Sequence, residues 1–187
     1  FRAHSGLMRA VVVYESMFGN TRRVAEAIAA GLREAGEVDV LRVNDATETT
    51  FDTADLIVVG GPTHVHGMSG PLTRIEAVRQ AGVPDSGLAL DPQPTELGVR
   101  EWLESAGELP VLFAAFDTRA DAFKWLTGSA AHQISKQLKH RDRTEVIEPG
   151  SFVTPDNDID DDEIERARAW GRAAGAAAQA QLGLVAD

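Results

Sequence analysis

Residues 10–32 of the chain are AVVVYESMFGNTRRVAEAIAAGL, an apolar run followed by a short polar turn and a segment with helical periodicity. The run from Ala10 to Tyr14 is continuously apolar, as expected of a parallel strand buried on both faces. From Asn20 onward the apolar residues follow one helical stripe, formed by Val24, Ile28, Leu32 and Ala35. The stretch therefore predicts a strand, a tight turn and a helix, which together make one β-α unit.

Four further strands are predicted downstream, separated by helical stretches. Their apolar residues span 38–43, 56–59, 111–116 and 146–153, and the last run is interrupted at Pro149 and Gly150. Alternating β and α units of this kind predict an α/β fold, a doubly wound parallel sheet with helices on both faces.

The chain's end and one internal segment need separate interpretation. Residues 160–163 are four consecutive acidic residues that precede a helical stripe. Carboxylates at the start of a helix complement the helix dipole. We therefore interpret these residues as a helix start rather than as a cation site. The stripe consists of Ile164, Ala167, Trp170 and Ala174. The segment from Pro84 to Thr95 is expected to be a loop inserted before a helix that carries Trp102 and Leu103. A loop of this length either has a function or is an ordinary surface excursion.

Length and composition limit the possible functions. With 187 residues and 43% hydrophobic residues, we expect a single domain over residues 8–187, and we interpret residues 1–7 as a remnant preceding the start at Met8. No apolar run is long enough for a transmembrane helix, so we expect a cytoplasmic protein without membrane partners. The chain has no cysteine, which excludes thiolate chemistry and iron–sulfur clusters.

The net charge of −11 disfavours nucleic acid as a partner, because phosphate binding requires cationic side chains. An acidic surface suits a basic protein partner, or it only maintains solubility.

The turn from Ser16 to Thr21 has the features of a phosphate site. It offers two hydroxyls, a glycine and a run of amides at the start of a helix, where the dipole favours anions. It lacks the Gly-Lys-Ser/Thr sequence of nucleoside-triphosphate loops and the three spaced glycines of the dinucleotide fingerprint. The alternative is an ordinary turn capped by Asn20 or Thr21.

A second segment, Gly60 to Pro71, follows the third predicted strand. Ligands of open α/β sheets bind outside the carboxyl ends of the strands, where this segment and the Ser16–Thr21 turn would meet. Its glycines and proline form a backbone wall suited to a flat heteroaromatic ring. His64 and His66 lack an accompanying acidic or cysteine ligand set, so we predict no metal site and assign them to polar contacts or solvent.

These motifs resemble the flavodoxin family. Ser16–Thr21 resembles its phosphate loop, Gly61–Pro71 resembles the flavin loop of flavodoxins and of related quinone reductases, and Phe116–Arg119 stands where the family has a second flavin-flanking loop. The resemblance implies a five-stranded sheet of order 2-1-3-4-5 and FMN as the cofactor. The cofactor-binding residues it implies are Ser16, Met17, Phe18, Gly19, Asn20, Thr21, Pro62, Thr63, His64, Val65, His66, Gly67, Phe116, Asp117, Thr118 and Arg119.

The chain departs from that family pattern in two ways. Phe18 stands where small flavodoxins often have a threonine. One hydroxyl that would bind the phosphate is therefore missing, and the backbone amide of Phe18 must bind it instead. No tryptophan lies in the 61–71 segment, so the faces that stack on the flavin are expected to come from His64, Phe116 or Trp125. Trp102 and Trp170 are expected in the core or in an interface.

The resemblance implies an FMN-binding electron carrier without catalytic side chains, which exchanges electrons with redox partner proteins. In such a carrier, Asp117 is expected near the pyrimidine edge of the flavin, where it would lower the potential. One alternative is an FMN-dependent NAD(P)H:quinone reductase, whose partners would be NAD(P)H and a quinone. Another is a cofactor-free interaction module on the same fold.

Overall fold

The computed structural model describes residues 7–64, 67–92, 94, 96–120 and 128–184, so the interpretation of residues 1–7 falls almost wholly outside the described residues. The strands are β1 (Met8–Tyr14), β2 (Gly36–Arg42), β3 (Leu56–His64), β4 (Gly67–Met68), β5 (Leu112–Ala120), β6 (Thr144–Glu145) and β7 (Gly150–Thr154). The helices are α1 (Asn20–Leu32), α2 (Pro71–Ala81), α3 (Val99–Ser105), α4 (Ala130–His140) and α5 (Asp161–Leu182), with the short 3-10 helices η1 (Glu48–Phe51) and η2 (Pro155–Asn157).

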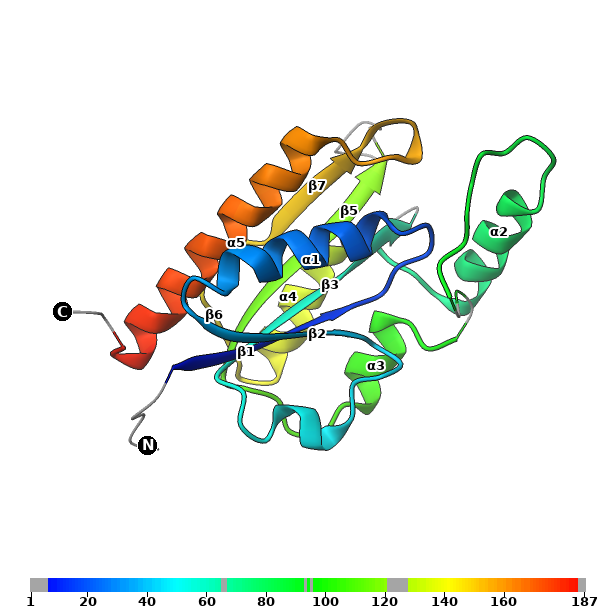
Figure 1. Cartoon of the computed structure of the whole chain (residues 1–187). Helices are drawn as coiled ribbons and strands as arrows, with labels where there is room; N and C mark the ends of the chain where they lie inside the picture. The colour runs from blue at the N-terminus through cyan, green and yellow to red at the C-terminus, as the bar shows by residue number, and fades with distance from the viewer. Residues whose placement is uncertain (1–6, 65–66, 93, 95, 121–127, 185–187) are drawn as a thin grey trace.

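The sheet has the predicted doubly wound order. Its strands run β2-β1-β3-β5-β6, all parallel, with β7 also paired to β5 (Figure 1). The order 2-1-3-4-5 is confirmed when β6 and β7 are counted as the two parts of the fifth strand. The short β4 pairs antiparallel with the end of β3.

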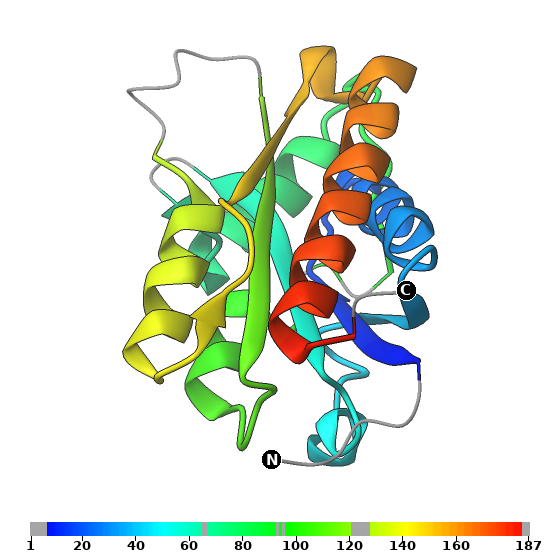
Figure 2. The ribbon, with the colours of Figure 1, turned by 90° about the vertical axis from the view of Figure 1, so that its left-hand side faces the viewer.

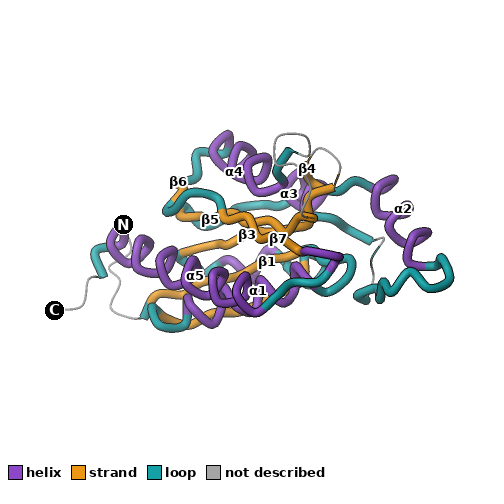
Figure 3. Tube along the Cα trace, turned by 90° about the horizontal axis from the view of Figure 1, so that it is seen from above, coloured by secondary structure: helices purple, strands orange, loops and turns teal. Residues whose placement is uncertain are grey.

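Helices cover both faces of the sheet, α1 and α5 on one side and α3 and α4 on the other (Figures 2 and 3). Successive side chains of a strand point to opposite faces, and β1 shows this clearly. Val12 belongs to the core beneath α1 and α5, whereas Val11 and Val13 belong to the core beneath α3 and α4. The unbroken valine run is thus explained by burial on both faces.

The break in the fifth strand lies where the proline was expected to interrupt it. The strand is divided into β6 and β7, and the register with β5 is interrupted over residues 146–149, where the Val146 amide still donates a hydrogen bond to the Phe113 carbonyl at 2.9 Å. Val146 and Ile147 nevertheless pack against the core under α5.

Two strands extend beyond their predicted ends. β3 continues to His64 and β5 continues to Ala120, so the residues from Gly60 to His64 and from Phe116 to Arg119 lie in strands rather than in loops. Proline is tolerated at Pro62 because the neighbouring β1 ends at Tyr14, opposite Gly60, which leaves that side of β3 unpaired.

The helix predicted near the C-terminal end of the chain is confirmed as α5. Asp160 caps α5 by accepting a hydrogen bond from the Glu163 amide at 2.8 Å, in agreement with the predicted helix start. Ala167 and Ala174 are buried, and Ile164 and Trp170 pack partly buried against the same core.

The segment before α3 is an irregular loop, as predicted, in the part of 84–95 that the structure describes. α2 stands away from the sheet, and the chain after it returns toward α3 (Figures 1 and 3). Trp102 on α3 is 4% exposed and packs against Phe51, which confirms its place in the core. Each helix of the described residues is too short or too polar to pass through a lipid bilayer.

Candidate functional site

A cavity of about 120 Å³ opens at the carboxyl edge of the sheet, where the ends of β1, β3, β5 and β7 meet. This is the edge at which open α/β folds bind their ligands. The residues that line the cavity are Met17, Phe18, Asn20, Thr21, Pro62, Thr63, His64, Thr118, Arg119, Ala120, Thr154 and Asn157.

The turn between β1 and α1 is shaped to present amides. Gly19 has a φ of 88°, a left-handed conformation that glycine adopts at little cost. Its amide donates to the Ser16 hydroxyl at 3.1 Å, and Ser16 is therefore buried behind the turn rather than in the cavity wall. Residues 16–21 are called the phosphate loop below.

The first turn of α1 has no side-chain cap. The first amides of any helix lack partners within the helix and need an acceptor from outside it. Gly19 occupies the capping position of α1 and has no side chain that could accept from them. Among the described residues, none accepts a hydrogen bond from the amides of Phe18, Asn20 or Thr21. These donors, together with the helix dipole, form a site suited to an anion.

Two side chains of the phosphate loop join it to distant segments of the chain. The hydroxyl oxygens of Thr21 and Thr118 lie 2.7 Å apart, and both residues are buried. The Asn20 amide group donates to the Asn157 carbonyl at 2.7 Å. The loop is thereby held against β5 and η2.

The last residues of β3 form a second wall of the cavity. Pro62, Thr63 and His64 all line it and are partly exposed. Burial of the His64 imidazole, with a contribution from the positive Arg74, lowers its pKa below the usual 6.5. His64 is therefore expected to be neutral at pH 7 and suited to contact with a ring.

Phe116 and Asp117 differ from their predicted roles as flavin contacts. The Phe116 side chain is fully buried in the core under α1 and α5, with its ring packed beneath Gly60. Position along the strand is the reason: the cavity is lined by the last residues of β5, 118–120, whereas Phe116 lies deeper in the sheet, paired with Gly60.

The Asp117 carboxylate is also fully buried and does not line the cavity. Its Oδ2 accepts hydrogen bonds from the hydroxyls of Thr63 and Ser129 and from the Ala131 amide at the start of α4, at 2.6–3.0 Å. Its Oδ1 accepts from the Ser151 hydroxyl at 2.6 Å. The carboxylate thus joins β3, α4 and β7 to β5, and its effect on the potential of a flavin stays a prediction.

A buried carboxyl group next to the phosphate loop joins the end of β1 to Ser69 and to the start of α3. Glu15 accepts a hydrogen bond from the Val99 amide at 2.8 Å and another from the Ser69 hydroxyl, which also accepts from Arg74 at 3.0 Å. Burial raises the pKa of Glu15, while the hydrogen bonds from Ser69 and Val99 and the charge of Arg74 act in the opposite direction.

The remaining predicted residues fall into three groups. Met17, Phe18, Asn20, Thr21, Pro62, Thr63, His64, Thr118 and Arg119 come together around the cavity, whereas Gly19 and Gly67 lie outside its lining. Val65, His66 and Trp125 lie outside the described residues.

The sequence analysis missed Ala120, Thr154 and Asn157. Ala120 and Thr154 end the strands β5 and β7, so the same rule that identified the first two segments applies to them. Asn157 has a φ of 61°, and asparagine tolerates this left-handed conformation better than most residues.

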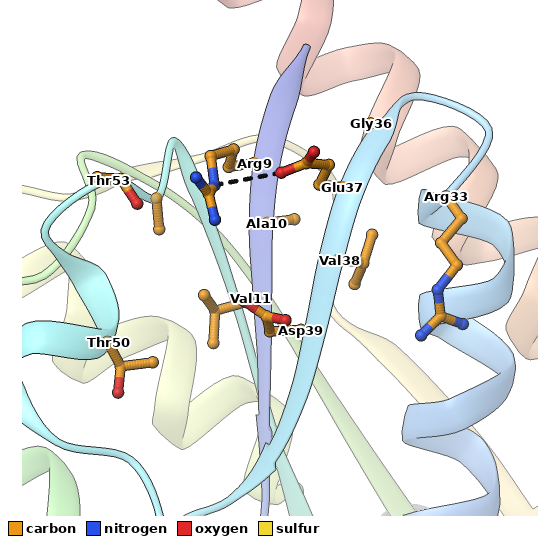
Figure 4. Close-up of a pocket in the computed structure, with 11 residues that line it drawn as sticks. Arg9, Ala10, Val11, Arg33, Gly36, Glu37, Val38, Asp39, Thr50 and Thr53 are labelled. Carbon is orange, nitrogen blue, oxygen red and sulfur yellow. Dashed lines mark ion pairs between the residues drawn. The ribbon is translucent and has the colours of Figure 1, made fainter.

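A larger hollow of about 410 Å³ lies at the opposite edge of the sheet, lined by the first residues of β1 and β2 (Figure 4). Arg9 and Glu37 form an ion pair across it at 3.6 Å, so these two charges are matched within the protein. Because it adjoins the amino ends of parallel strands, it is not the edge at which such sheets bind ligands. We therefore assign the functional site to the smaller cavity.

The chain is similar to flavodoxins in sequence. A family model described as Flavodoxin matches residues 12–170. A flavodoxin of Aquifex aeolicus is 35% identical over 68 residues, which are 35% of this chain and 37% of the relative, so the match spans little more than a third of that protein.

Solved structures share the fold at low sequence identity. A flavodoxin from the domain Archaea has a TM-score of 0.62 at 19% identity, covering 92% of this chain and 99% of that one. Flavodoxin 2 from Bacillus cereus has a TM-score of 0.62 at 16% identity, covering 90% of this chain and 98% of that one.

Proposed function

The chain belongs to the flavodoxin family, and from that membership we propose that residues 8–187 form one FMN-binding domain that carries electrons to or from a partner protein. Bound FMN would supply the redox chemistry, and the protein would set its position and electrostatic surroundings. Direct NAD(P)H:quinone reductase activity is the outcome that would replace the carrier role.

One observation carries the proposal. The amides of Phe18, Asn20 and Thr21 have no acceptor among the described residues, and these residues line a cavity whose other walls come from β3 and β5. A cavity of about 120 Å³ is smaller than the roughly 300–1,000 Å³ of complete ligand sites. Its donor set and size fit the phosphate end of FMN.

The residues present can be assigned to parts of the cofactor. The phosphate loop would hold the phosphate by its amides and by the hydroxyl of Thr21. Pro62, Thr63 and His64 would lie along the ring, with a neutral imidazole at pH 7 as the polar group of that wall. Thr118 and Arg119 would close the side formed by β5.

The surface near the cavity supports a basic partner. Asn157 lines the cavity, and the exposed acids Asp158, Asp160, Asp161 and Asp162 follow it directly. The whole chain carries a net charge of −11. Such a surface would attract a basic reductase or acceptor by long-range electrostatics.

Flavin titration tests cofactor binding. The apoprotein would be titrated with FMN and with riboflavin, following flavin fluorescence and the visible absorption bands. We expect one FMN per chain, bound at least about tenfold more tightly than riboflavin, because an anion held by several charge-assisted hydrogen bonds gains well over 1.4 kcal/mol. Failure to bind either flavin, or equal affinities, would contradict the proposal.

A second measurement separates the carrier from the enzyme. Reduction of the flavoprotein by a basic reductase should slow as salt is raised, because charges farther apart than about 10 Å are screened at 0.1 M ionic strength. A rate independent of salt, together with steady turnover of quinone by NAD(P)H alone, would identify a quinone reductase instead.

A further inference from the structure

The segment after α2 returns across the molecule and touches the phosphate loop. Its residues 83–92 are called the strap, drawn in green after α2 in Figure 1. At its end, the Asp91 amide donates a hydrogen bond to the Met17 carbonyl at 2.8 Å. The inserted loop therefore makes a direct contact with the backbone of the proposed cofactor site.

That hydrogen bond fixes the orientation of one peptide. In a planar trans peptide the carbonyl and the amide of the next residue point in opposite directions. The Met17 carbonyl faces the strap, so the Phe18 amide faces away from it, and Phe18 itself lines the cavity. Phe18 has no side-chain donor, so this amide is the only hydrogen bond that the position can give.

The strap is held in place by charge as well as by its backbone. The Asp91 carboxylate is 8% exposed and lies 3.5 Å from Arg22 Nε and 4.0 Å from Arg42 Nη1. Arg42 also donates to the carbonyl of Pro92. Asp91 thus bridges α1 and β2 from the strap, and its charge raises the pKa of Arg22.

We propose that the strap holds the phosphate loop in its anion-binding conformation, with Asp91 as the positioning residue that turns the Phe18 amide into the cavity. The inference rests on the proposed binding of a flavin phosphate. It gives the inserted segment a defined role, namely to order a loop that lacks a hydroxyl at position 18.

Charge alone predicts a different result, and this makes the proposal testable. If Asp91 acted only by repelling a phosphate, its removal would tighten FMN binding, and removal of Arg42 would weaken it. If the strap orders the loop, both changes loosen the strap and both weaken FMN. The two substitutions therefore have opposite charge effects and the same structural effect.

The experiment compares Asp91→Ala and Arg42→Met with the unmodified protein. Methionine keeps the apolar stem of Arg42 without its charge. We expect each variant to weaken FMN about fivefold or more, as loss of one net hydrogen bond implies, with riboflavin changed by less than about twofold. Hydrogen exchange of the amides at 16–21 in the apoprotein should become faster in both variants.

Asp85→Asn is the matched control, because Asp85 lies in the same strap, is exposed and has a φ of 61° that asparagine tolerates. It removes one negative charge without touching the phosphate loop and should change neither readout. Tighter FMN binding by Asp91→Ala, unchanged exchange at 16–21, or equal losses for FMN and riboflavin would each overturn the proposal. Failure of the unmodified protein to bind FMN would instead reject the proposed function, and the exchange measurement would still decide whether the strap orders the loop.

Discussion

The hydroxyl oxygens of Thr21 and Thr118 lie 2.7 Å apart, although 97 positions separate the two residues in the chain. Both side chains are nearly fully buried and both residues line the cavity. One hydroxyl proton is used between the two oxygens, whichever atom donates it, so the other proton remains free to reach a ligand. The pair therefore supplies one oriented donor to the proposed phosphate site.

Replacing Thr21 by valine should remove that donor while keeping the volume of the side chain. We expect FMN to bind about tenfold more weakly, the loss of a charge-assisted hydrogen bond of about 1.5 kcal/mol or more, with riboflavin nearly unaffected. Thr118→Val should have a similar effect because it breaks the same pair. Thr154→Val is the control, since the Thr154 hydroxyl is already donated to the Arg119 carbonyl. Equal losses for the two flavins would place the phosphate elsewhere.

Gly60→Ala should destabilise the fold without touching the proposed phosphate site. A Cβ at this position would lie 2.2 Å from the ring of Phe116, which is fully buried and has no room to move. Overpacking of this kind typically costs about 1–3 kcal/mol of unfolding free energy. Gly82 ends helix α2 in ordinary αR geometry, which alanine also adopts. Gly82→Ala should therefore change the unfolding free energy very little. Urea unfolding of both variants measures the difference, and equal stabilities would contradict the packing described here.

Asp117→Ala should cost more stability than the loss of any one of its partners. The substitution leaves the donors at positions 63, 129, 131 and 151 without the carboxylate that accepts from them. We expect about 3 kcal/mol or more, because these hydrogen bonds are to a charged group. Ser151→Ala removes one of the donors and should cost about 1 kcal/mol. Denaturant titration decides the order, and a smaller loss for Asp117→Ala would contradict the assigned role.

Glu15 should lower the unfolding free energy as pH rises, whereas most carboxylates in folded proteins raise it. Burial raises its pKa above the ordinary 4.5, so between these values the folded chain binds more protons than the unfolded chain. Its contribution is therefore fully present below pH 4.5 and is lost as pH rises through the raised pKa. The unfolding free energy of the wild type should fall relative to that of Glu15→Gln over this window. Parallel stability curves for the two proteins would contradict the prediction.

The sequence predicted the elements whose signals are local. The apolar run before Asn20 and the helical stripe after it identified the first unit, and burial on both faces confirmed the meaning of the valine run. The positions of the site followed from one topological rule, because parallel strands end at a common edge. That rule, applied also to β7, would have found Thr154.

The roles that were predicted incorrectly depend on contacts between distant parts of the chain. Gly60, Gly61 and Pro62 indicate a loop by composition, yet β3 continues through them because it still pairs with β5, and the end of β1 beside Gly60 leaves room for the proline on the other side. Asp117 looks like a ligand contact after a strand, but its partners lie at positions that no local pattern connects to it. Once β5 is extended to Ala120, the distance of each residue from the end of the strand decides which of them reach the cavity, because residues 118–120 line it and Phe116 and Asp117 do not.

The division of the fifth strand into β6 and β7 has a consequence for contacts between molecules. A long, regular strand at the border of a sheet offers a row of free backbone groups on which a strand of another molecule can add. Here that border consists of segments of two and five residues separated by a bend that contains Pro149. Neither segment gives an incoming strand a continuous template, so the interruption protects this side of the domain against edge-to-edge association.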